Sequence, residues 1–200
     1  MNTLLLATRN AGKVKEISEI LKNLHVRIRS LMDFAGLPQT VEDGLTLEEN
    51  ALNKARAGFK QTGIPSLGDD SGLEVFHLNG KPGVYSARYA GDRATFDDNN
   101  KKLLDALQGV QSDRRRAQFR CVVAFVAEGI EKVVEGACSG IIAEQPRGNR
   151  GFGYDPIFVP GGFHETFGEM LPDIKNQISH RGKALAVIKE FLQQYYQRRS

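Results

Sequence analysis

The chain has 200 residues, 40% of them hydrophobic, and its 27 Lys and Arg against 24 Asp and Glu give a net charge of only +3. A chain of this length buries roughly 70% of the surface it exposes when unfolded, so its core needs no disulfide or structural metal. The weak, dispersed charge argues against a nucleic-acid footprint, and the longest apolar run, 122–127, is far shorter than the ~20 residues of a membrane span. We therefore expect one cytoplasmic domain over residues 1–200, with no signal peptide, no membrane partner and no stable nucleic-acid binding.

The first third of the chain alternates between strand and helix signals. Residues 3–7 are compatible with a strand, the letters TRNAGK follow as a turn, and apolar residues then recur at helical spacing as far as Leu24. A second helix opens at Thr46, because Thr46 and Glu49 form a capping box, and it should end near Gly63.

The middle of the chain predicts two extended runs and a third helix. Residues 66–68 and 73–78 favour strands and are separated by the polar segment 69–72. Thr95 and Asp98 then predict the start of the third helix.

The clearest strand signal lies in the second half of the chain. Alternating apolar residues over 117–125 and a second extended run over 132–142 predict a long β-hairpin. A turn at residues 129–130 would place Cys121 opposite Cys138 as reduced, buried neighbours. Neither cysteine belongs to a CxxC pair, so we expect neither a disulfide nor a zinc site.

The chain closes with a helix, marked by an apolar stripe over residues 184–195. Short basic clusters at 114–116 and 198–199 are expected to lie on solvated faces. Together the elements predict a mixed α/β fold whose sheet has long hairpin strands flanked by helices, rather than a purely doubly wound sheet.

The first candidate site is the loop between the first strand and the first helix. Backbone amides at a helix N-terminus bind anions readily, and small, polar residues ending in a lysine suit a phosphate. The loop is not a P-loop, since GxxxxGK[ST] is absent, and an ordinary helix cap would use the same residues. Its members are Thr8, Arg9, Asn10, Ala11, Gly12 and Lys13.

Two pairs of adjacent carboxylates form the second candidate. Glu42 with Asp43 and Asp69 with Asp70 repel within each pair unless a cation compensates them. Mg²⁺ typically takes one or two carboxylates together with substrate phosphates, so it fits better than zinc. The alternative for residues 69–72 is an Asx-turn followed by glycine.

Three further features could contribute to a site. Lys54 allows an ordinary surface ion pair within its helix, and a functional role for it depends on the fold. Two aromatics and an Asp-Pro pair in 151–156 could stack on a base or simply form a buried turn. Lys175 and the Ser-His-Arg-Gly run at 179–182 suit recognition, although a lone histidine is more often structural. There is no GxSxG motif and neither cysteine has a local activating histidine, so water is the expected nucleophile.

With these residues in place, the sequence resembles the inosine triphosphate pyrophosphatase family. The letters ATRNAGK, GLTLEENALNKARA, DDSGLEV, KPGVYSARYAG, GFGYDPIF and ISHRGKAL occur in the family's order and approximate spacing, from residue 7 to about residue 185. The resemblance implies an elongated α/β fold with a long mixed sheet and two lobes around a central cleft, usually as a homodimer. It also implies Mg²⁺-dependent hydrolysis of ITP, dITP and XTP to the monophosphate and pyrophosphate, which keeps these nucleotides out of DNA and RNA.

The resemblance also assigns roles to residues of this chain. It implies Asp70 as the catalytic residue, Glu42 and Asp70 as metal ligands, and Asp69 in support of them. The implied phosphate contacts are Thr8, Arg9, Asn10, Ala11, Gly12, Lys13, Lys54 and Ser71, with Arg9 standing where the family often has glycine. The implied base pocket comprises Phe152, Gly153, Tyr154 and Asp155, and the base edge is read by Lys175, His180 and Arg181. We hypothesise that Asp70 orients or deprotonates the attacking water while Glu42 holds metal, or that one carboxylate does both.

Two alternatives remain beside this interpretation. One is a nucleotide pyrophosphatase that prefers another modified base, such as a modified pyrimidine, and a substrate panel separates it. The other is a nucleotide-binding module without turnover, against which Glu42, Lys54 and Asp70 argue.

Overall fold

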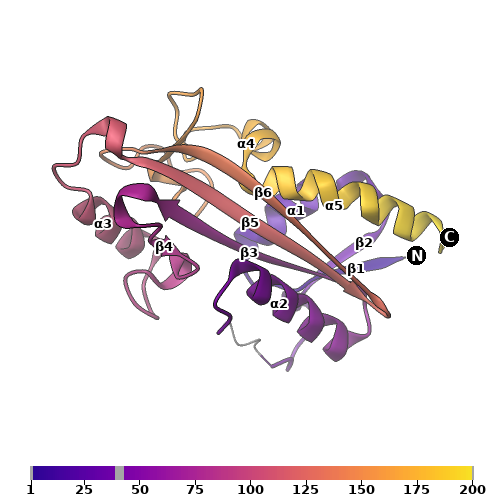
Figure 1. Ribbon diagram of the computed structural model, residues 1–200. Coiled ribbons are helices and arrows are strands. Elements are labelled where there is room, and N and C mark those ends of the chain that lie inside the picture. Colours follow the sequence, from indigo (N-terminus) through magenta and orange to yellow (C-terminus); the bar gives the residue numbers. More distant parts are fainter. Residues whose placement is uncertain (1, 39–42, 200) are drawn as a thin grey trace. The chain divides into compact units, whose positions relative to one another are not determined.

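A single mixed sheet organises the secondary structure of the computed structural model, which describes residues 2–38 and 43–199 (Figure 1). Within these residues the sheet has seven strands in the order β2-β1-β3-β5-β6-β7, and β4 pairs with β3. The strands are β1 (Thr3–Leu6), β2 (Arg27–Ser30), β3 (Ser66–Val75), β4 (Pro82–Gly83), β5 (Arg116–Ala127), β6 (Ile130–Ile142) and β7 (Phe158–Pro160). The helices are α1 (Ala11–Ile20), α2 (Leu47–Thr62), α3 (Phe96–Ala106), α4 (Pro172–Ile178) and α5 (His180–Gln197), with short 3-10 helices between them. The predicted mixed α/β class with a long hairpin is confirmed.

The chain divides into two compact units. Unit 1 comprises residues 1–70, 121–136 and 181–200, and unit 2 comprises residues 71–120 and 137–180. Strands β3, β5 and β6 each contribute residues to both units. No helix in the described ranges has the length and apolar character needed to cross a membrane.

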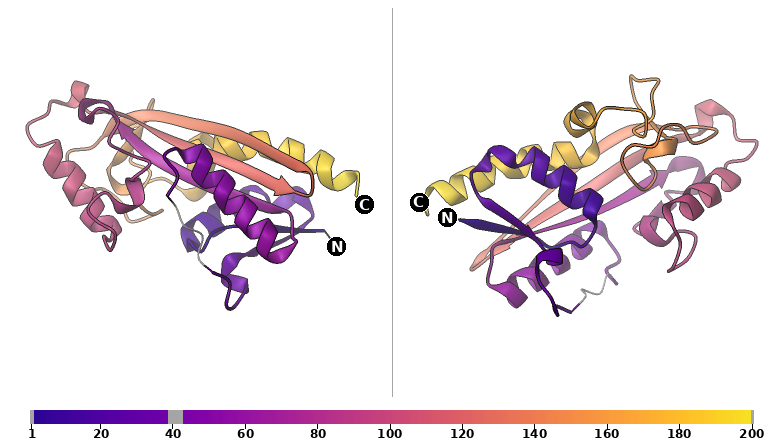
Figure 2. Two further views of the ribbon diagram at one scale, coloured as in Figure 1. Left: turned by 60° about the horizontal axis from the view of Figure 1, so that its bottom comes forward. Right: turned by 180° about the vertical axis from the view of Figure 1, so that it is seen from behind.

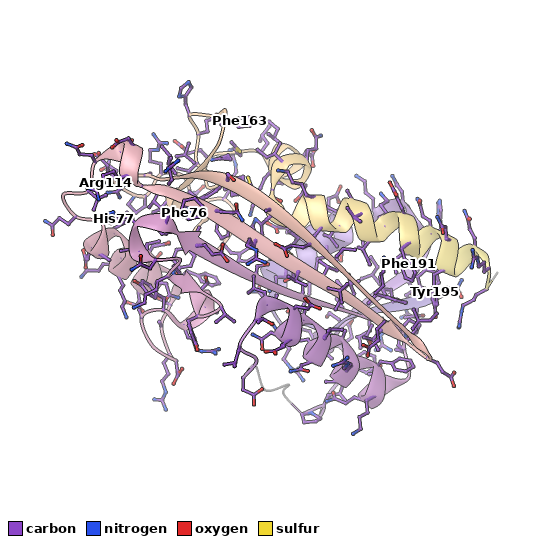
Figure 3. The ribbon with its side chains drawn as sticks, in the orientation of Figure 1. Phe76, His77, Arg114, Phe163, Phe191 and Tyr195 are labelled. Atoms are coloured by element: carbon purple, nitrogen blue, oxygen red, sulfur yellow. The ribbon has the colours of Figure 1, made fainter. Side chains whose placement is uncertain are left out.

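Parallel strands and two neighbouring helices build the core of unit 1. β1 pairs in parallel with both β2 and β3, with Leu6 opposite Leu67 on β3. Helices α1 and α5 lie side by side on one face of these strands (Figure 2), where Lys189 Nζ donates a hydrogen bond to Ile20 O at 3.1 Å. Phe191 and Tyr195, labelled on α5 in Figure 3, both contact the ring of Phe125 edge-on.

Helix α2 covers the other face of β1 and β3 (Figures 1 and 2) and packs there very closely. A Cβ atom at Gly68 would lie 2.1 Å from the carbonyl oxygen of Ala51, so only glycine permits this approach. The helix begins with the predicted capping box of Thr46 and Glu49 and ends at Gly63, which adopts the left-handed conformation with φ 68°. This close packing brings side chains of α2 against the middle of β3.

An aromatic cluster forms the core of unit 2. The rings of Phe119, Phe158 and Phe167 pack together, with 4.8 Å between the centroids of Phe119 and Phe158. β7 pairs antiparallel with β6, and helix α3 begins with the capping box predicted at Thr95 and Asp98.

The polar segment 69–72 is not a turn, which corrects one interpretation of the sequence. Strand β3 runs without interruption from Ser66 to Val75 through all four of these residues. The carboxylates of Asp69 and Asp70 are compensated by buried cations from other elements, so the strand carries them in its interior.

The predicted register of the long hairpin is also wrong. Its turn occupies residues 128–129, one position earlier than expected, because Gly129 adopts the required positive φ of 69° while Ile130 packs against the core of unit 1. Cys121 and Cys138 are both buried, as expected, but they belong to separate core clusters.

One further expectation fails for a reason that only the fold explains. Arg115 is not solvated: it is buried, and its guanidinium donates hydrogen bonds to the carbonyls of Leu107, Ile142 and Ala143 at 2.8 to 2.9 Å. The last helix begins before the apolar stripe over 184–195 that marks it in the sequence, since α5 already starts at His180. The short helix α4 just before it has no strong sequence signal beyond a proline in its first turn.

Candidate active site

The loop that joins β1 to α1 presents the N-terminal end of a helix. Asn10 is the N-cap of α1, and its side chain accepts a hydrogen bond from Lys13 N at 3.1 Å. Thr8 Oγ1 in turn accepts from Asn10 N at 3.1 Å, which fixes the loop. Ala11 and Gly12 open the helix, where backbone N–H groups have no acceptor within the helix. The loop therefore has the geometry of an anion site.

The side chain of Arg9 bonds to the backbone of unit 1. Its guanidinium donates hydrogen bonds to the carbonyls of Leu31 at 3.2 Å and Leu37 at 2.9 Å. These bonds tie the loop to the segment that follows β2. A contact between the backbone amide of Arg9 and a phosphate stays a prediction.

Two lysines from different helices converge on one backbone oxygen of β3. Lys13 Nζ on α1 donates to the carbonyl oxygen of Asp69 at 3.1 Å, and Lys54 Nζ on α2 donates to the same oxygen at 3.3 Å. The two ammonium groups thus lie close together beside the loop at the start of α1. Positive charge concentrated in this way is suited to a polyphosphate.

Asp70 lies beside Lys54 and is buried. Its Oδ1 is 2.6 Å from Lys54 Nζ, and its Oδ2 accepts a hydrogen bond from Asn50 Nδ2 at 3.3 Å. Asn50 was not among the predicted site residues, although a signal existed: Asn50 precedes Lys54 by four positions and so shares its helix face. Asn50 also accepts from Gly44 N at 3.0 Å, which connects Asp70 to the loop before α2.

The predicted metal ligands are only partly visible. Glu42 lies outside the described residues, whereas Asp43 is described and exposed. Within residues 2–38 and 43–199 no group of three or more His, Cys, Asp or Glu side chains could hold a metal ion. Asp70 nevertheless fits Mg²⁺ chemically, because this ion needs only one or two protein carboxylates when substrate phosphates complete its ligands.

Asp69 has different partners from Asp70, although the two residues are adjacent. Its carboxylate pairs with Lys13 and with Arg181 Nε, the latter at 3.1 Å, and accepts a hydrogen bond from Cys121 Sγ at 2.9 Å. Burial by itself would raise the pKa of Asp69, but the charges of Arg181 and Lys13 outweigh it and hold the pKa well below its usual value. Asp69 is therefore ionised inside the core of unit 1.

A second group of predicted residues comes together in unit 2, around the carboxylate of Asp155. Asp155 Oδ2 accepts a hydrogen bond from Phe152 N at 2.7 Å and lies 2.5 Å from Lys175 Nζ, and both charged side chains are buried. Gly151 has φ 73°, and a Cβ there would meet Asp155 Oδ2 at 1.9 Å. The loop therefore needs glycine at this position to wrap around the carboxylate.

The ring of Phe152 is held by its neighbours. Lys175 Nζ lies 5.2 Å from its centroid, and the ring of Phe96 on α3 lies 6.1 Å away, tilted by 42°. Asn100, also on α3, donates to Gly153 O at 3.0 Å. A cavity of about 620 Å³ in unit 2 is lined by Phe96, Asn100, Phe152 and Gly153 among others, but not by Lys175. Phe96 and Asn100 were not among the predicted site residues, because their only sequence signal is their position on one side of an amphipathic helix.

The remaining predicted residues are distributed between the units. Tyr154 is fixed in unit 2 by a hydrogen bond from its hydroxyl to Ser86 O at 2.9 Å. His180 stacks on Phe119 with 4.5 Å between ring centroids, whereas Arg181 belongs to unit 1 and uses all three guanidinium nitrogens on the carboxylates of Asp69 and Glu16. Ser71 follows Asp70 on β3.

A helix N-terminal loop with two converging lysines beside a buried carboxylate, and an aromatic loop on a Lys–Asp pair, are features expected of a nucleotide-binding α/β protein. Comparison with known sequences makes the class specific: the Ham1 family model matches residues 4–191. The chain belongs to the Ham1 family.

Similar proteins match nearly the whole chain. A protein from Geobacter sulfurreducens named dITP/XTP pyrophosphatase is 48% identical over 193 residues, which cover 96% of this chain and 97% of the relative. The structure of a HAM1 protein from Coxiella burnetii is 42% identical, has a TM-score of 0.86, and covers 97% of this chain and 100% of its own. A Mycobacterium abscessus structure, titled nucleoside-triphosphatase and dITP/XTP pyrophosphatase, is 45% identical with a TM-score of 0.73, over 93% of this chain and 98% of that one.

Proposed function

We propose that this protein hydrolyses deaminated purine nucleoside triphosphates, namely ITP, dITP and XTP, to the nucleoside monophosphate and pyrophosphate. Membership of the Ham1 family and relatives named dITP/XTP pyrophosphatase support the reaction. The observation that carries the proposal is the convergence of Lys13 and Lys54 on one oxygen beside the buried carboxylate of Asp70. This arrangement places two positively charged groups that suit a polyphosphate next to a carboxylate that can act on water.

In this mechanism the lysines and the loop amides oppose the charge of the triphosphate. Negative charge builds up on the phosphoanhydride oxygens as the bond between the α and β phosphates breaks, and preorganised donors stabilise it. Lys13 and the N–H groups at the start of α1 serve one side of the phosphate chain. Lys54 serves the other side and also fixes Asp70 through their ion pair.

Asp70 is the proposed catalytic residue. Its ionised carboxylate accepts a hydrogen bond from the attacking water and orients or deprotonates it, which requires a distance of about 2.6 to 3.2 Å in the substrate complex. Asn50 donates to the second carboxylate oxygen and so limits the rotation of the group.

Mg²⁺ is the proposed cofactor, with Asp70 and Glu42 as its protein ligands. When bound, the ion neutralises charge on the phosphate oxygens and acts as a Lewis acid. Asp70 is the ligand within the described residues, and its carboxylate is the type of group that Mg²⁺ prefers.

The base is assigned to the residues gathered in unit 2. Phe152 offers a ring for stacking, and the Lys175 ammonium offers N–H donors. Hypoxanthine and xanthine carry an acceptor oxygen at position 6, where adenine carries an amino donor. Adenine would leave a buried donor of the site unpaired, and such a mismatch can disfavour a substrate by as much as roughly 10⁴-fold. We also propose that Tyr154, Asp155, His180 and Arg181 contribute to this recognition, as the family resemblance implies.

We further propose that the protein acts in the cytoplasm as a homodimer. The two buried cysteines form no disulfide, which fits a reducing compartment. The dimer follows from the family resemblance, and light scattering on the purified protein measures it directly.

One assay tests the proposed reaction. The purified protein is incubated with Mg²⁺ and dITP, XTP, dATP or dGTP in parallel, and pyrophosphate and orthophosphate are quantified separately. We expect pyrophosphate from dITP and XTP and little from dATP and dGTP. Orthophosphate as the product contradicts the bond assignment, and equal cleavage of all four substrates contradicts the base preference. Binding without any product favours the non-catalytic module.

A further inference from the structure

Four side chains of alternating charge, the middle two of them buried, form a connected chain in unit 1. Lys13 pairs with Asp69, Asp69 accepts from Arg181 Nε at 3.1 Å, and Arg181 Nη1 donates to Glu16 at 2.6 Å. The side chains of Asp69 and Arg181 are 1% and 2% exposed, and those of Lys13 and Glu16 are 14% exposed. Because Lys13 and Glu16 are one turn apart on α1, the helix contributes both ends of the chain.

Asp69 is engaged on both carboxylate oxygens. Oδ1 faces Lys13, and Oδ2 accepts from Arg181 Nε and from Cys121 Sγ at 2.9 Å. Successive side chains of a strand point to opposite faces, which explains why Asp69 meets α1 and α5 whereas Asp70 meets Lys54 on α2. The two adjacent carboxylates therefore serve two separate groups of partners.

Lys13 is held by Asp69 in a way that leaves it able to bind a further anion. An ammonium group has three N–H donors. One is directed to the carboxylate of Asp69 and another to the carbonyl oxygen of the same residue at 3.1 Å. The third remains for a phosphate oxygen at the loop that precedes α1.

We propose that Asp69 is a positioning residue that fixes the Lys13 ammonium at the phosphate loop, and that Glu16 and Arg181 hold Asp69 in place from the other side. The inference rests on the proposed function, because it assigns Lys13 to the triphosphate. It gives Asp69 a role distinct from that of Asp70: Asp69 acts through Lys13 and touches neither metal nor water.

A double-mutant cycle tests this role. Asp69→Asn and Lys13→Met are measured alone and together for binding of tripolyphosphate by calorimetry, without Mg²⁺, and for kcat and KM with dITP. We expect each single variant to weaken tripolyphosphate binding by at least about tenfold, and Asp69→Asn to cost less than about threefold when Lys13 is already replaced. In turnover, Asp69→Asn should raise KM more than it lowers kcat. Equal costs of Asp69→Asn in both backgrounds would overturn the proposal, since they would show a general structural role.

A matched pair on one helix keeps the test decisive if Asp69→Asn does not fold, which urea unfolding reports. Glu16→Gln loosens the far end of the charge chain, whereas Glu19→Gln alters an exposed carboxylate of α1 that forms an ion pair with the exposed side chain of Lys22. We expect Glu16→Gln to weaken tripolyphosphate binding about two- to fivefold and Glu19→Gln to leave it unchanged. Identical behaviour of the two variants would overturn the proposal.

Tripolyphosphate separates this inference from the proposed reaction. If the wild type releases no pyrophosphate from dITP, the proposed function fails while the binding cycle still judges Asp69. If the wild type does not bind tripolyphosphate, the positioning role itself is overturned.

Discussion

Lys54 Nζ lies 2.6 Å from Asp70 Oδ1, and the two side chains are only 8% and 9% exposed. A buried ion pair of this kind contributes little net stability, but removing one partner leaves an uncompensated charge. The pair therefore fixes the Asp70 side chain at the place where the proposed mechanism needs a carboxylate.

Asp70→Asn should lower kcat by about 10²–10⁴-fold while dITP still binds, because the change preserves the shape of the side chain and removes its charge. Steady-state kinetics and calorimetric binding measure the two effects, and Asp173→Asn, an exposed carboxylate on α4, is the control. Near-normal turnover of Asp70→Asn would remove Asp70 from the catalytic role.

Phe152→Ala should weaken the binding of purine nucleotides by about 1–3 kcal/mol if stacking on the ring supplies most of its contribution to the binding free energy. Phe163→Ala is the matched control, since Phe163 is a partly exposed ring in another loop of unit 2 (Figure 3). Calorimetry with dITP and XTP should show the loss for Phe152→Ala alone. Unchanged affinity would contradict the assignment of this ring to the base.

Tyr154 and Tyr196 should ionise only well above the usual pH range for tyrosine. Burial raises the pKa of both phenols, and each hydroxyl donates a hydrogen bond that the phenolate could not make, to Ser86 O and Thr3 O respectively. Because the folded pKa is raised, this contribution to stability is present below the unfolded pKa and is lost as pH rises above it.

Absorbance at 295 nm during an alkaline titration measures this effect. The change due to these two residues should coincide with unfolding at high pH, and Tyr154→Phe and Tyr196→Phe should each remove part of it. Full ionisation of all tyrosines in the folded protein near pH ~10, the ordinary value, would contradict the prediction.

Gly68→Ala should destabilise unit 1 by about 1–3 kcal/mol or more, because the new methyl group would collide with the backbone of α2 at Ala51. Gly161→Ala is the matched control: its Cβ would meet only Ser139 O, at 3.4 Å, so a change within about 0.5 kcal/mol is expected. Urea unfolding compares the two variants. Equal stability of both would show that α2 can move away from β3 without cost.

Local signals predicted both ends of helix α2. The capping box of Thr46 and Glu49 and the left-handed Gly63 gave both ends of α2, since capping bonds join residues only a few positions apart. The hairpin turn was misplaced by one residue because Gly129 and Ile130 are distinguished by packing against the core, which no local signal contains. Arg115 was misjudged for the same reason, since its acceptors include Ile142, 27 positions away.

The sequence by itself indicated β1, β3, the long hairpin and the helices α1, α2, α3 and α5, and it carried the motifs that mark the family. These features depend on spacing, capping and turn chemistry within short segments. Only the tertiary structure decided the division of labour between Asp69 and Asp70, which look equivalent in the letters DDSG. Their partners lie as far as 112 positions away, at Arg181. The alternation of a strand sends the two carboxylates to opposite faces, and each charge is stabilised by whichever distant helix the fold packs against that face.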